Sequence, residues 1–315
     1  MKRVACIGTA TIDIKARPYA SIPLGSNADG RVHICTGGVG LAMSRNFAQL
    51  GFEAHLFTLV GPDIYGDQVI LDAKDSGVNT DTIERLDSYS TATCVTLLDQ
   101  NGITQYSVFD GEIIRWITPQ YLQPHLELLL RTDLLVANTD LKQETLAFLS
   151  NLAFENSIYF YVNVSSTTSA KDIIPIANKT SLLGMNYKEA EELVGYEVTS
   201  PTQAIQAGRD LLSIGPREVI ITLGSKGLVY CNPSREYSLK ALPAQIVDTT
   251  GAGDALCSAF LYYRFTGSEI EESLEYALAA AAMTVETRYT VCPTLTPQTV
   301  TQLRQVFTEK LRNSD

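Results

Sequence analysis

Asp248-Thr249-Thr250-Gly251-Ala252-Gly253-Asp254 runs directly into a segment whose apolar side chains recur with the period of a helix. Two glycines around one alanine leave the backbone uncrowded, and the first turn of a helix presents N–H groups that lack partners within the helix. Gly251, Ala252 and Gly253 are therefore expected to form an anion-binding turn. Asp254 falls in the first helical turn, where an acidic side chain beside a phosphate suits a base that takes a proton from an attacking hydroxyl. An ordinary glycine-rich turn capped by an aspartate is the alternative interpretation.

Upstream of this turn, short apolar runs alternate with segments of helical period. That alternation predicts an α/β fold in which a mostly parallel sheet is covered by helices on both faces. The expected strands are 4–7, 54–60, 134–137, 158–162, 181–185 and 218–223. The expected helices are 38–50, 119–130, 142–152, 186–194, 202–214, 255–265, 269–287 and 297–311, the seventh opened by a capping box of Ser268 and Glu271.

Two stretches, about 10–36 and 90–112, interrupt the alternation. The first is polar and contains glycine and proline where a helix is due, and the second holds two β-rich runs separated by Asp99-Gln100-Asn101-Gly102. Asn-Gly is a strong hairpin signal, and two strands alone bury little apolar surface. We expect both stretches to pair into a small β-sheet across one edge of the main domain, as a lid over an active site or as a dimer interface.

The composition excludes several classes of protein. The chain has 315 residues, of which 45% are hydrophobic and 19% charged, as in ordinary globular proteins. A net charge of −11 without a basic run argues against nucleic acid as a partner. No apolar stretch approaches the ~18 residues that span a membrane, and six scattered cysteines without a C-x-x-C pair suggest a cytoplasmic protein. The P-loop pattern G-x-x-x-x-G-K-[ST] is also missing.

Four motifs occur in one order along the chain. They are Gly37-Gly38 at the start of an early helix, Asn186-Tyr187-Lys188-Glu189, Thr222-Leu223-Gly224-Ser225-Lys226-Gly227, and the opening string 248–254. Together they resemble the di-glycine, N-x-x-E, T-x-G-x-x-G and D-T-x-G-A-G-D elements of the ribokinase-like (phosphofructokinase B) carbohydrate kinases. The resemblance spans essentially the whole chain. It implies one domain over 1–315, a three-layer α/β/α fold with a β-sheet lid, and transfer of the γ-phosphoryl group of ATP to a sugar hydroxyl with Mg²⁺.

The resemblance also implies roles for individual residues. Gly251, Ala252 and Gly253 correspond to the anion hole and Asp254 to the catalytic base. Glu189 corresponds to a residue that supports Mg²⁺ through water, although with Asn186 it also matches a plain capping box. The implied ATP contacts are Asn186, Thr222, Gly224 and Gly227, and the implied site for a monovalent cation such as K⁺ is Asp248 with Thr250.

At the substrate end, Asp13 matches an acidic residue that binds sugar hydroxyls in relatives. Asp110, just after the second β-rich run of 90–112, is a further candidate. The other expected substrate contacts are Asn27, Gly37, Gly38 and Asn46. Asn46 is included because Ala42 stands where relatives carry an asparagine, and a shifted helix would let Asn46 replace it.

Within the family, several stretches are similar to pseudouridine kinases. They are Ser26-Asn27 with Gly30, Gly37-Gly38-Val39-Gly40, Val60-Gly61 with Asp63 and Gly66, and 135–140. Val39 replaces a lysine that ribokinases usually carry. Besides Ala42, two positions depart from the family, namely Asn163 where an aspartate is common and Gly184 where a lysine is common.

The expected reaction is ATP-dependent phosphorylation of pseudouridine to pseudouridine 5′-phosphate by a homodimer joined through the lid. Two alternatives stay open. One is a kinase for another sugar or nucleoside, such as ribose, fructose, adenosine or an aldonate. The other is a catalytically weak sugar- or nucleoside-binding protein.

Overall fold

The central element of the fold is a large β-sheet, here called the main sheet, against which the helices pack. The structure is a computed structural model that describes residues 1–23 and 25–312. The sheet has eight strands in the order β14-β13-β12-β11-β10-β9-β1-β4, parallel except where β13 pairs with β12 and β14. The strands are β1 (Arg3–Ile7), β4 (Glu53–Phe57), β9 (Leu134–Asn138), β10 (Tyr159–Asn163), β11 (Leu182–Asn186), β12 (Glu218–Thr222), β13 (Leu228–Cys231) and β14 (Glu236–Leu239). Their apolar, β-branched composition suits strands that are buried on both faces.

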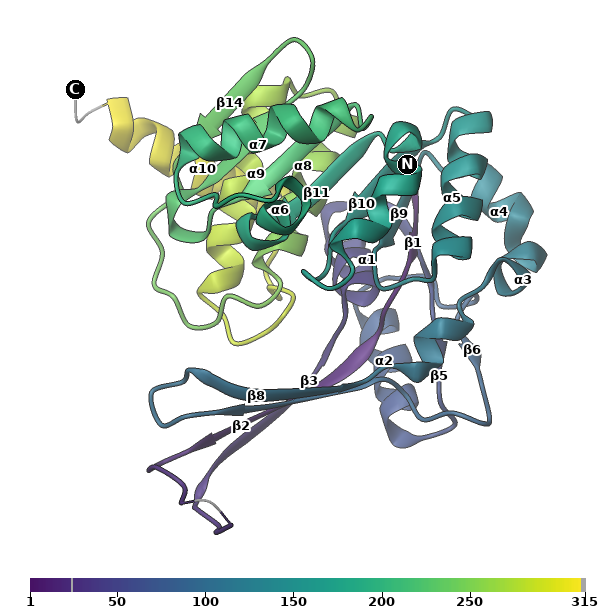
Figure 1. Cartoon of the computed structure of the whole chain (residues 1–315), viewed down its shortest axis with the longest axis vertical. Helices are drawn as coiled ribbons and strands as arrows, with labels where there is room; N and C mark the ends of the chain where they lie inside the picture. The colour runs from purple at the N-terminus through teal and green to yellow at the C-terminus, as the bar shows by residue number, and fades with distance from the viewer. Residues whose placement is uncertain (24, 313–315) are drawn as a thin grey trace.

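Helices cover both faces of this sheet (Figure 1). Successive side chains of a strand point to opposite faces of the sheet. In β1, Val4 and Cys6 therefore belong to one hydrophobic core, and Ala5 and Ile7 belong to the other. The first core includes α1 (Val39–Leu50), α8 (Ala252–Phe265) and α9 (Ile270–Val285). The second includes α3 (Pro119–Leu122), α5 (Gln143–Glu155), α6 (Tyr187–Val194) and α7 (Pro201–Ser213). The expected three-layer α/β/α fold is confirmed.

The second sheet, here called the small sheet, consists of β2 (Thr11–Pro18), β3 (Gly30–Gly37), β7 (Thr93–Leu98) and β8 (Thr104–Asp110). Its order is β3-β2-β7-β8, so the two stretches that interrupted the alternation pair with each other as expected. The small sheet extends below the main sheet, on the side where the parallel strands end (Figure 1). The predicted hairpin is present, with Asp99 accepting backbone N–H groups across its turn.

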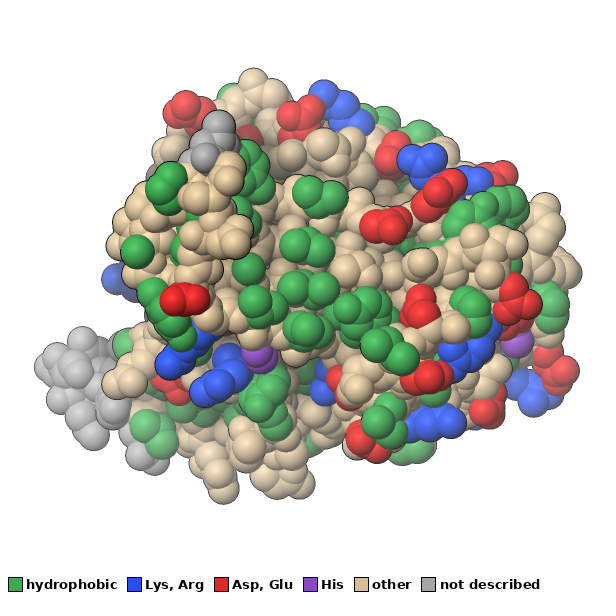
Figure 2. All heavy atoms as spheres, turned by 90° about the horizontal axis from the view of Figure 1, so that it is seen from below, with side chains coloured by type: hydrophobic (Ala, Val, Ile, Leu, Met, Phe, Trp, Pro, Cys, Tyr) green, Lys and Arg blue, Asp and Glu red, His purple; other side chains and the backbone are tan. Residues whose placement is uncertain are grey.

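The register of its strands gives the small sheet one apolar face and one polar face. Ile14 lies beside Ile34 and Val95, and Val95 lies beside Val108, so one face is apolar. That face points away from the main body, and hydrophobic side chains gather on it when the molecule is seen from below (Figure 2). The opposite face carries Asp13 and its neighbours and turns toward the main sheet.

Three expected elements differ in the structure. The run 54–60 divides into β4 and β5 (Leu59–Val60), and β5 pairs with β6 (Glu84–Arg85) instead of the main sheet. The run 119–130 divides into α3, a 3₁₀ turn and α4 (Leu126–Leu130), because Pro124 lacks the N–H that a continuous helix needs. The predicted capping box is wrong, since α9 has Glu269 at its N-cap with no side-chain hydrogen bond.

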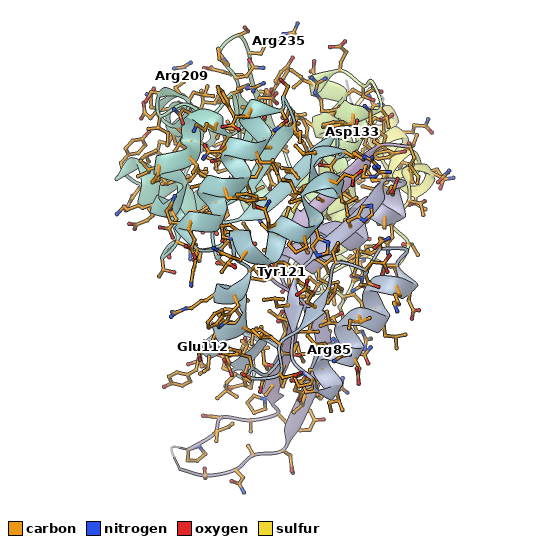
Figure 3. The ribbon with its side chains drawn as sticks, turned by 90° about the vertical axis from the view of Figure 1, so that its right-hand side faces the viewer. Arg85, Glu112, Tyr121, Asp133, Arg209 and Arg235 are labelled. Atoms are coloured by element: carbon orange, nitrogen blue, oxygen red, sulfur yellow. The ribbon has the colours of Figure 1, made fainter. Side chains whose placement is uncertain are left out.

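The remaining helices are α2 (Ile64–Asp75), next to the small sheet, and α10 (Pro297–Arg312), which begins at the predicted proline. Side-on, the labelled Arg209 and Arg235 lie at the end of the body farthest from the small sheet (Figure 3). Tyr121 lies between these extremes, where its buried hydroxyl donates to the Thr58 and Thr82 carbonyls. Within the described part of the chain, no helix is long and apolar enough to cross a membrane.

Candidate active site

Polar side chains stand at the carboxyl ends of four neighbouring parallel strands. Asn138 ends β9, Asn163 ends β10, Asn186 ends β11 and Thr222 ends β12. Asn138 pairs with Asn163 in register, and Asn186 pairs with Thr222. In open α/β sheets ligands bind outside the carboxyl ends of the strands. This row therefore marks the edge of the main sheet that faces the small sheet as the place for a ligand.

The glycine-rich turn lies at the start of α8. Gly251 is the N-cap with φ +81°, and a Cβ there would collide with the carbonyl oxygen of Thr290. Gly253 is exposed, and a Cβ there would meet nothing within 4 Å. No side chain among the described residues caps this helix end. The first glycine thus serves the backbone conformation, while the second leaves open space in front of the helix N-terminus, where an anion is stabilised.

Asp254 lies in the first turn of α8, directly behind that space. The amide nitrogen of Asn163 donates to its Oδ1 at 3.3 Å. Burial, reinforced by the negative charge of Glu189, raises the pKa of Asp254 to about 7. A carboxylate with such a pKa is suited to exchange protons near neutral pH.

Glu189 belongs to a group of acidic side chains around this point. It is 6% exposed, and burial raises its pKa to about 7, with a further contribution from the charge of Asp140. Burial also raises the pKa of Asp140, which accepts a hydrogen bond from Asn138 at 2.6 Å. Among the described residues, no lysine or arginine forms an ion pair with Asp140, Glu189 or Asp254. Among the described residues, no three acidic, histidine or cysteine side chains converge closely enough to ligate an ion directly, so a cation such as Mg²⁺ would be held here through its hydration water.

Asn186 and Glu189 also form the capping box that the spacing allows. Asn186 Oδ1 accepts the N–H groups of Lys188 and Glu189 at 2.9 and 3.1 Å. Glu189 Oε2 accepts the N–H of Asn186 at 2.7 Å. The cap occupies one carboxylate oxygen of Glu189, so it does not conflict with a contact to water or metal by the other.

The other candidates for nucleotide contacts follow β12. Thr222 ends the strand beside Asn186, and Gly224 begins a 3₁₀ turn with φ +58°. Gly227 ends that turn with φ +100°, and a Cβ there would collide with the carbonyl oxygen of Leu239. The turn therefore depends on glycine at Gly227, and the structure places all three residues at the same edge of the sheet as Asn186.

Asp13 lies on the inner face of the small sheet, in β2. Burial raises its pKa, against a hydrogen bond from Thr11 and the positive charge of Lys15. A Cβ on Gly37 would collide with the Asp13 carboxylate. Gly38, the N-cap of α1, has φ +90° and a Cβ there would lie 2.6 Å from the Thr9 carbonyl oxygen. The di-glycine thus allows close approach between the helix start and the strand that carries Asp13.

The three remaining candidates for substrate contacts, Asn27, Asn46 and Asp110, lie in three separate parts of the structure. Asn27 is exposed in the loop between β2 and β3. That loop lies at the far tip of the small sheet (Figure 1). Asn46 is completely buried in α1, and neither polar atom of its amide has a hydrogen-bond partner within the part of the chain that the structure describes. Asp110 ends β8 and, with Asp140, lines a cavity of about 630 Å³.

The departures from the family pattern have structural counterparts. Asn163 and Gly184 are register partners on β10 and β11. A Cβ at Gly184 would lie 2.5 Å from the hydroxyl oxygen of the fully buried Tyr161, so glycine makes room for that ring. Asn163 donates to Asp254, which an aspartate at that position would do only when protonated. Ala42 is 1% exposed within α1.

Four residues of this region were missed as site residues: Lys15, Asn138, Asp140 and Asn163. Three of them stand at or just after the end of a buried strand, which is a signal that the sequence does contain. Lys15 contacts Asp248 at 2.6 Å and Thr250 at 2.7 Å. These partners are more than 230 positions away in the chain, so no local pattern indicates this contact.

Comparisons with known proteins identify the family and the fold of the chain. The sequence profile of the "pfkB family carbohydrate kinase" matches residues 1–296. The chain is 27% identical over 301 residues to the pseudouridine kinase of Escherichia coli K12, covering 95% of this chain and 96% of that protein. It is 26% identical over 288 residues to the ribokinase of Bacillus subtilis 168, covering 90% and 93%. The structure of Arabidopsis thaliana ribokinase complexed with ribose and ATP superposes with a TM-score of 0.87 at 22% identity, covering 97% and 99%.

Proposed function

Since this chain belongs to the pfkB family of carbohydrate kinases, we propose that it transfers the γ-phosphoryl group of ATP to a hydroxyl of a nucleoside or sugar. The observation that carries this proposal is the position of Asp254. Its carboxylate lies in the first turn of α8, behind the open space at Gly253, and its pKa is raised to about 7. An anion site and a base near neutrality, side by side, are what phosphoryl transfer to a hydroxyl requires.

In the proposed reaction Asp254 takes the proton from the acceptor hydroxyl as its oxygen attacks the γ-phosphorus. The bond from phosphorus to the β–γ bridging oxygen breaks, and ADP leaves with that oxygen. Gly251, Ala252 and Gly253 face the transferred group with the N-terminus of α8, which favours the negative charge of the transition state. Asn163 holds the carboxylate in place through its 3.3 Å hydrogen bond. Asn186, Thr222, Gly224 and Gly227 contact the nucleotide.

Mg²⁺ would be held near Glu189 through water, with Asp140 adding negative charge. When bound, the ion would screen the charge of the phosphates. Glu189, Asp140 and Asp254 would act on the ion only through water and charge, because no metal-holding cluster of such side chains exists among the described residues and none of the three has a cationic partner there.

For the acceptor we propose pseudouridine, phosphorylated at its 5′-hydroxyl. Support comes from the similarity to the E. coli pseudouridine kinase along 95% of this chain and from apolar Val39 in the turn after the di-glycine. Asp13, beside Gly37 and Gly38, would accept hydrogen bonds from the ribose hydroxyls.

A panel of acceptors tests both the proposed phosphoryl transfer and the proposed substrate, pseudouridine. Pseudouridine, ribose, deoxyribose, fructose, adenosine, guanosine and an aldonate are each incubated with ATP and Mg²⁺, and ADP formation is followed. We expect the highest kcat/KM with pseudouridine. If pseudouridine is inert and another acceptor reacts, the substrate is corrected and the kinase stands. If no acceptor gives ADP formation above the rate measured without an acceptor, the proposed phosphoryl transfer to these acceptors fails. If an acceptor reacts equally fast with Asp254→Asn, the kinase stands and the assignment of the base falls.

We further propose that residues 10–36 and 90–112 are the lid of a single catalytic domain over 1–315. The polar face of the small sheet contacts the loop that leads into α8, the helix that carries Asp254, as a lid over the acceptor would. The opposite face is apolar, and five of its large side chains are between 44% and 71% accessible: Val32, Ile34, Val95, Tyr106 and Val108. Exposed apolar patches of this kind mark interaction surfaces. The partner we propose is a second copy of the chain.

A further inference from the structure

Lys15 joins the small sheet to the loop that precedes the anion site. Its Nζ lies 2.6 Å from Asp248 Oδ2 and 2.7 Å from Thr250 Oγ1. Asp248 Oδ1 in turn accepts the N–H of Thr250 at 2.9 Å and its hydroxyl at 2.7 Å. The side chains of Lys15 and Asp248 are 22% and 26% exposed, so water only partly screens the pair. The Lys15 ammonium, the Asp248 carboxylate and Thr250 thus form one hydrogen-bonded network directly before Gly251.

Asp248 and Thr250 are the residues that the family pattern assigns to a monovalent cation, and here they do not fit one. The positive charge that such an ion would supply is already present on Lys15, at hydrogen-bond distance from both oxygens. An ion on the same oxygens would lie beside the ammonium, and two like charges at ~4 Å repel by several kcal/mol in a partly buried environment. The three donors of the ammonium also satisfy the network without a second cation.

The same lysine connects the two halves of the proposed reaction site. Asp13 and Lys15 are two residues apart on β2, so their side chains share the inner face of the small sheet. Thr250 immediately precedes Gly251, the N-cap of α8. The strand that carries the proposed sugar ligand is therefore linked by a charge-assisted hydrogen bond to the loop that carries the anion hole.

We propose that Lys15 is a positioning residue that takes the place of a monovalent cation, fixing the loop 248–251 to the small sheet and making the kinase independent of K⁺. This inference rests on the proposed kinase activity. The lysine touches neither the reacting atoms nor the nucleotide. It acts through Asp248 and Thr250, which hold the backbone of the anion-binding turn.

The wild-type enzyme provides the first test. Activity is measured with its best acceptor while KCl is exchanged for tetramethylammonium chloride at constant ionic strength, in a buffer free of K⁺, Na⁺ and NH₄⁺. We expect kcat to stay constant within about twofold, because the site already contains its cation. Activation by K⁺ of about tenfold or more would overturn the proposal.

The second test removes only the charge. Lys15→Met keeps most of the side-chain stem, and we expect kcat to fall by about 10²-fold, as small displacements of catalytic groups do. Added K⁺ should restore most of this loss, which a merely structural role would not allow. Arg17→Met is the matched control, since Arg17 is on the same face of β2 but its guanidinium binds the Gln100 carbonyl at the hairpin. A Lys15→Met enzyme with wild-type kcat, or with a loss that K⁺ leaves unchanged, overturns the proposal.

Thermal unfolding separates this inference from the kinase assignment. In the absence of substrates, K⁺ should raise the Tm of Lys15→Met relative to tetramethylammonium and leave the wild type and Arg17→Met unchanged. This readout needs no turnover, so it stands if every acceptor proves inert and the proposed function fails. A K⁺-specific increase of Tm in the wild type would show that the cation binds beside Lys15, and the proposal would fall.

Discussion

Asp254 depends on its immediate neighbours for its proposed chemistry. Asn163 donates to one carboxylate oxygen, while burial and the charge of Glu189 favour the protonated form. An aspartate at its ordinary pKa near 3.8 would be a weak base at neutral pH. The neighbours thus convert a common side chain into a base that operates near pH 7.

Removing this base should affect chemistry far more than binding. Asp254→Asn is expected to lower kcat by ~10²–10⁴-fold, the usual contribution of a general base. ATP affinity, measured by calorimetry, should be nearly unchanged, because the asparagine retains the size of the aspartate. A variant that keeps more than about a third of the wild-type kcat under chemistry-limited conditions would contradict the assignment.

The pH dependence should report the same carboxylate. The base acts when deprotonated, so with a pKa of about 7 the value of kcat/KM should rise between pH 6 and pH 8. Glu189→Gln removes a negative neighbour and should move this rise toward lower pH. Asn163→Asp adds a negative neighbour and should move the rise of kcat/KM toward higher pH. We expect each variant to shift the rise by about one pH unit. Both substrates are kept below saturation so that the unliganded enzyme is reported, and an unchanged profile in both variants would assign the titration to another group.

At the scale of elements, two helix starts carry the proposed site. The N-terminus of α6 is closed by the capping box of Asn186 and Glu189. The N-terminus of α8 has no side-chain cap and leaves open space in front of Gly253. The first helix start is therefore self-contained, and the second is available to an anion.

Glu189→Gln tests whether that capping box also serves a metal. Glutamine retains a carbonyl oxygen that can accept the N–H of Asn186, so stability should change by less than the ~1 kcal/mol of a lost cap. The negative charge is lost, and we expect the Mg²⁺ concentration for half-maximal activity to rise by about tenfold or more. Reduced stability with an unaltered Mg²⁺ requirement would mean that Glu189 is only a cap.

The two glycines of the α8 turn should respond differently to alanine. At Gly251, alanine meets both φ +81° and the Thr290 carbonyl oxygen, so Gly251→Ala should lose well over 1 kcal/mol of unfolding free energy. At Gly253 a Cβ meets no protein atom within 4 Å and φ is not positive, so Gly253→Ala should keep its stability. Its methyl group would enter the anion space and reduce kcat. Chemical denaturation and kinetics on both variants test this contrast, which fails if Gly253→Ala is fully active.

At the scale of the whole molecule, the small sheet brings together what the chain separates. Its inner face holds Asp13 and Lys15 against the edge of the main sheet, and its outer face presents an apolar surface to solvent (Figure 2). A sheet with one exposed apolar face is unfavourable in isolation and is stabilised when another surface covers it. The proposed lid and the proposed dimer interface are thus the two faces of one element.

Val108→Lys tests the dimer. Val108 is 69% exposed on the apolar face, in the edge strand β8, and a charge there should prevent two copies from packing together. We expect sedimentation velocity at micromolar concentration to give a dimer for the wild type and a monomer for Val108→Lys. Leu130→Lys, at an exposed apolar position at the end of α4, is the control and should remain dimeric. A monomeric wild type would refute the proposed assembly.

The order of strands and helices, the anion-binding turn and the small sheet could be predicted from the sequence because each has a local cause. Buried strands require continuous apolar runs, the hairpin follows from Asn101-Gly102, and the start of α8 requires glycine at Gly251. Local composition gave two wrong predictions. The run 54–60 was expected to be one strand, but its end pairs with β6 and forms a separate strand. The run 119–130 was expected to be one helix, but Pro124 interrupts it.

The tertiary structure alone decided which distant groups meet. Asn163 reaches Asp254 because the end of β10 lies beside the start of α8, and Glu189 acts on Asp254 because burial weakens the screening of its charge. Asn46 is buried because the side of α1 that it occupies packs inward. Lys15 meets Asp248 and Thr250 across more than 230 residues of chain. Such contacts depend on how sheets and helices pack, and electrostatic interactions act through space, so no periodicity or motif in one segment contains them.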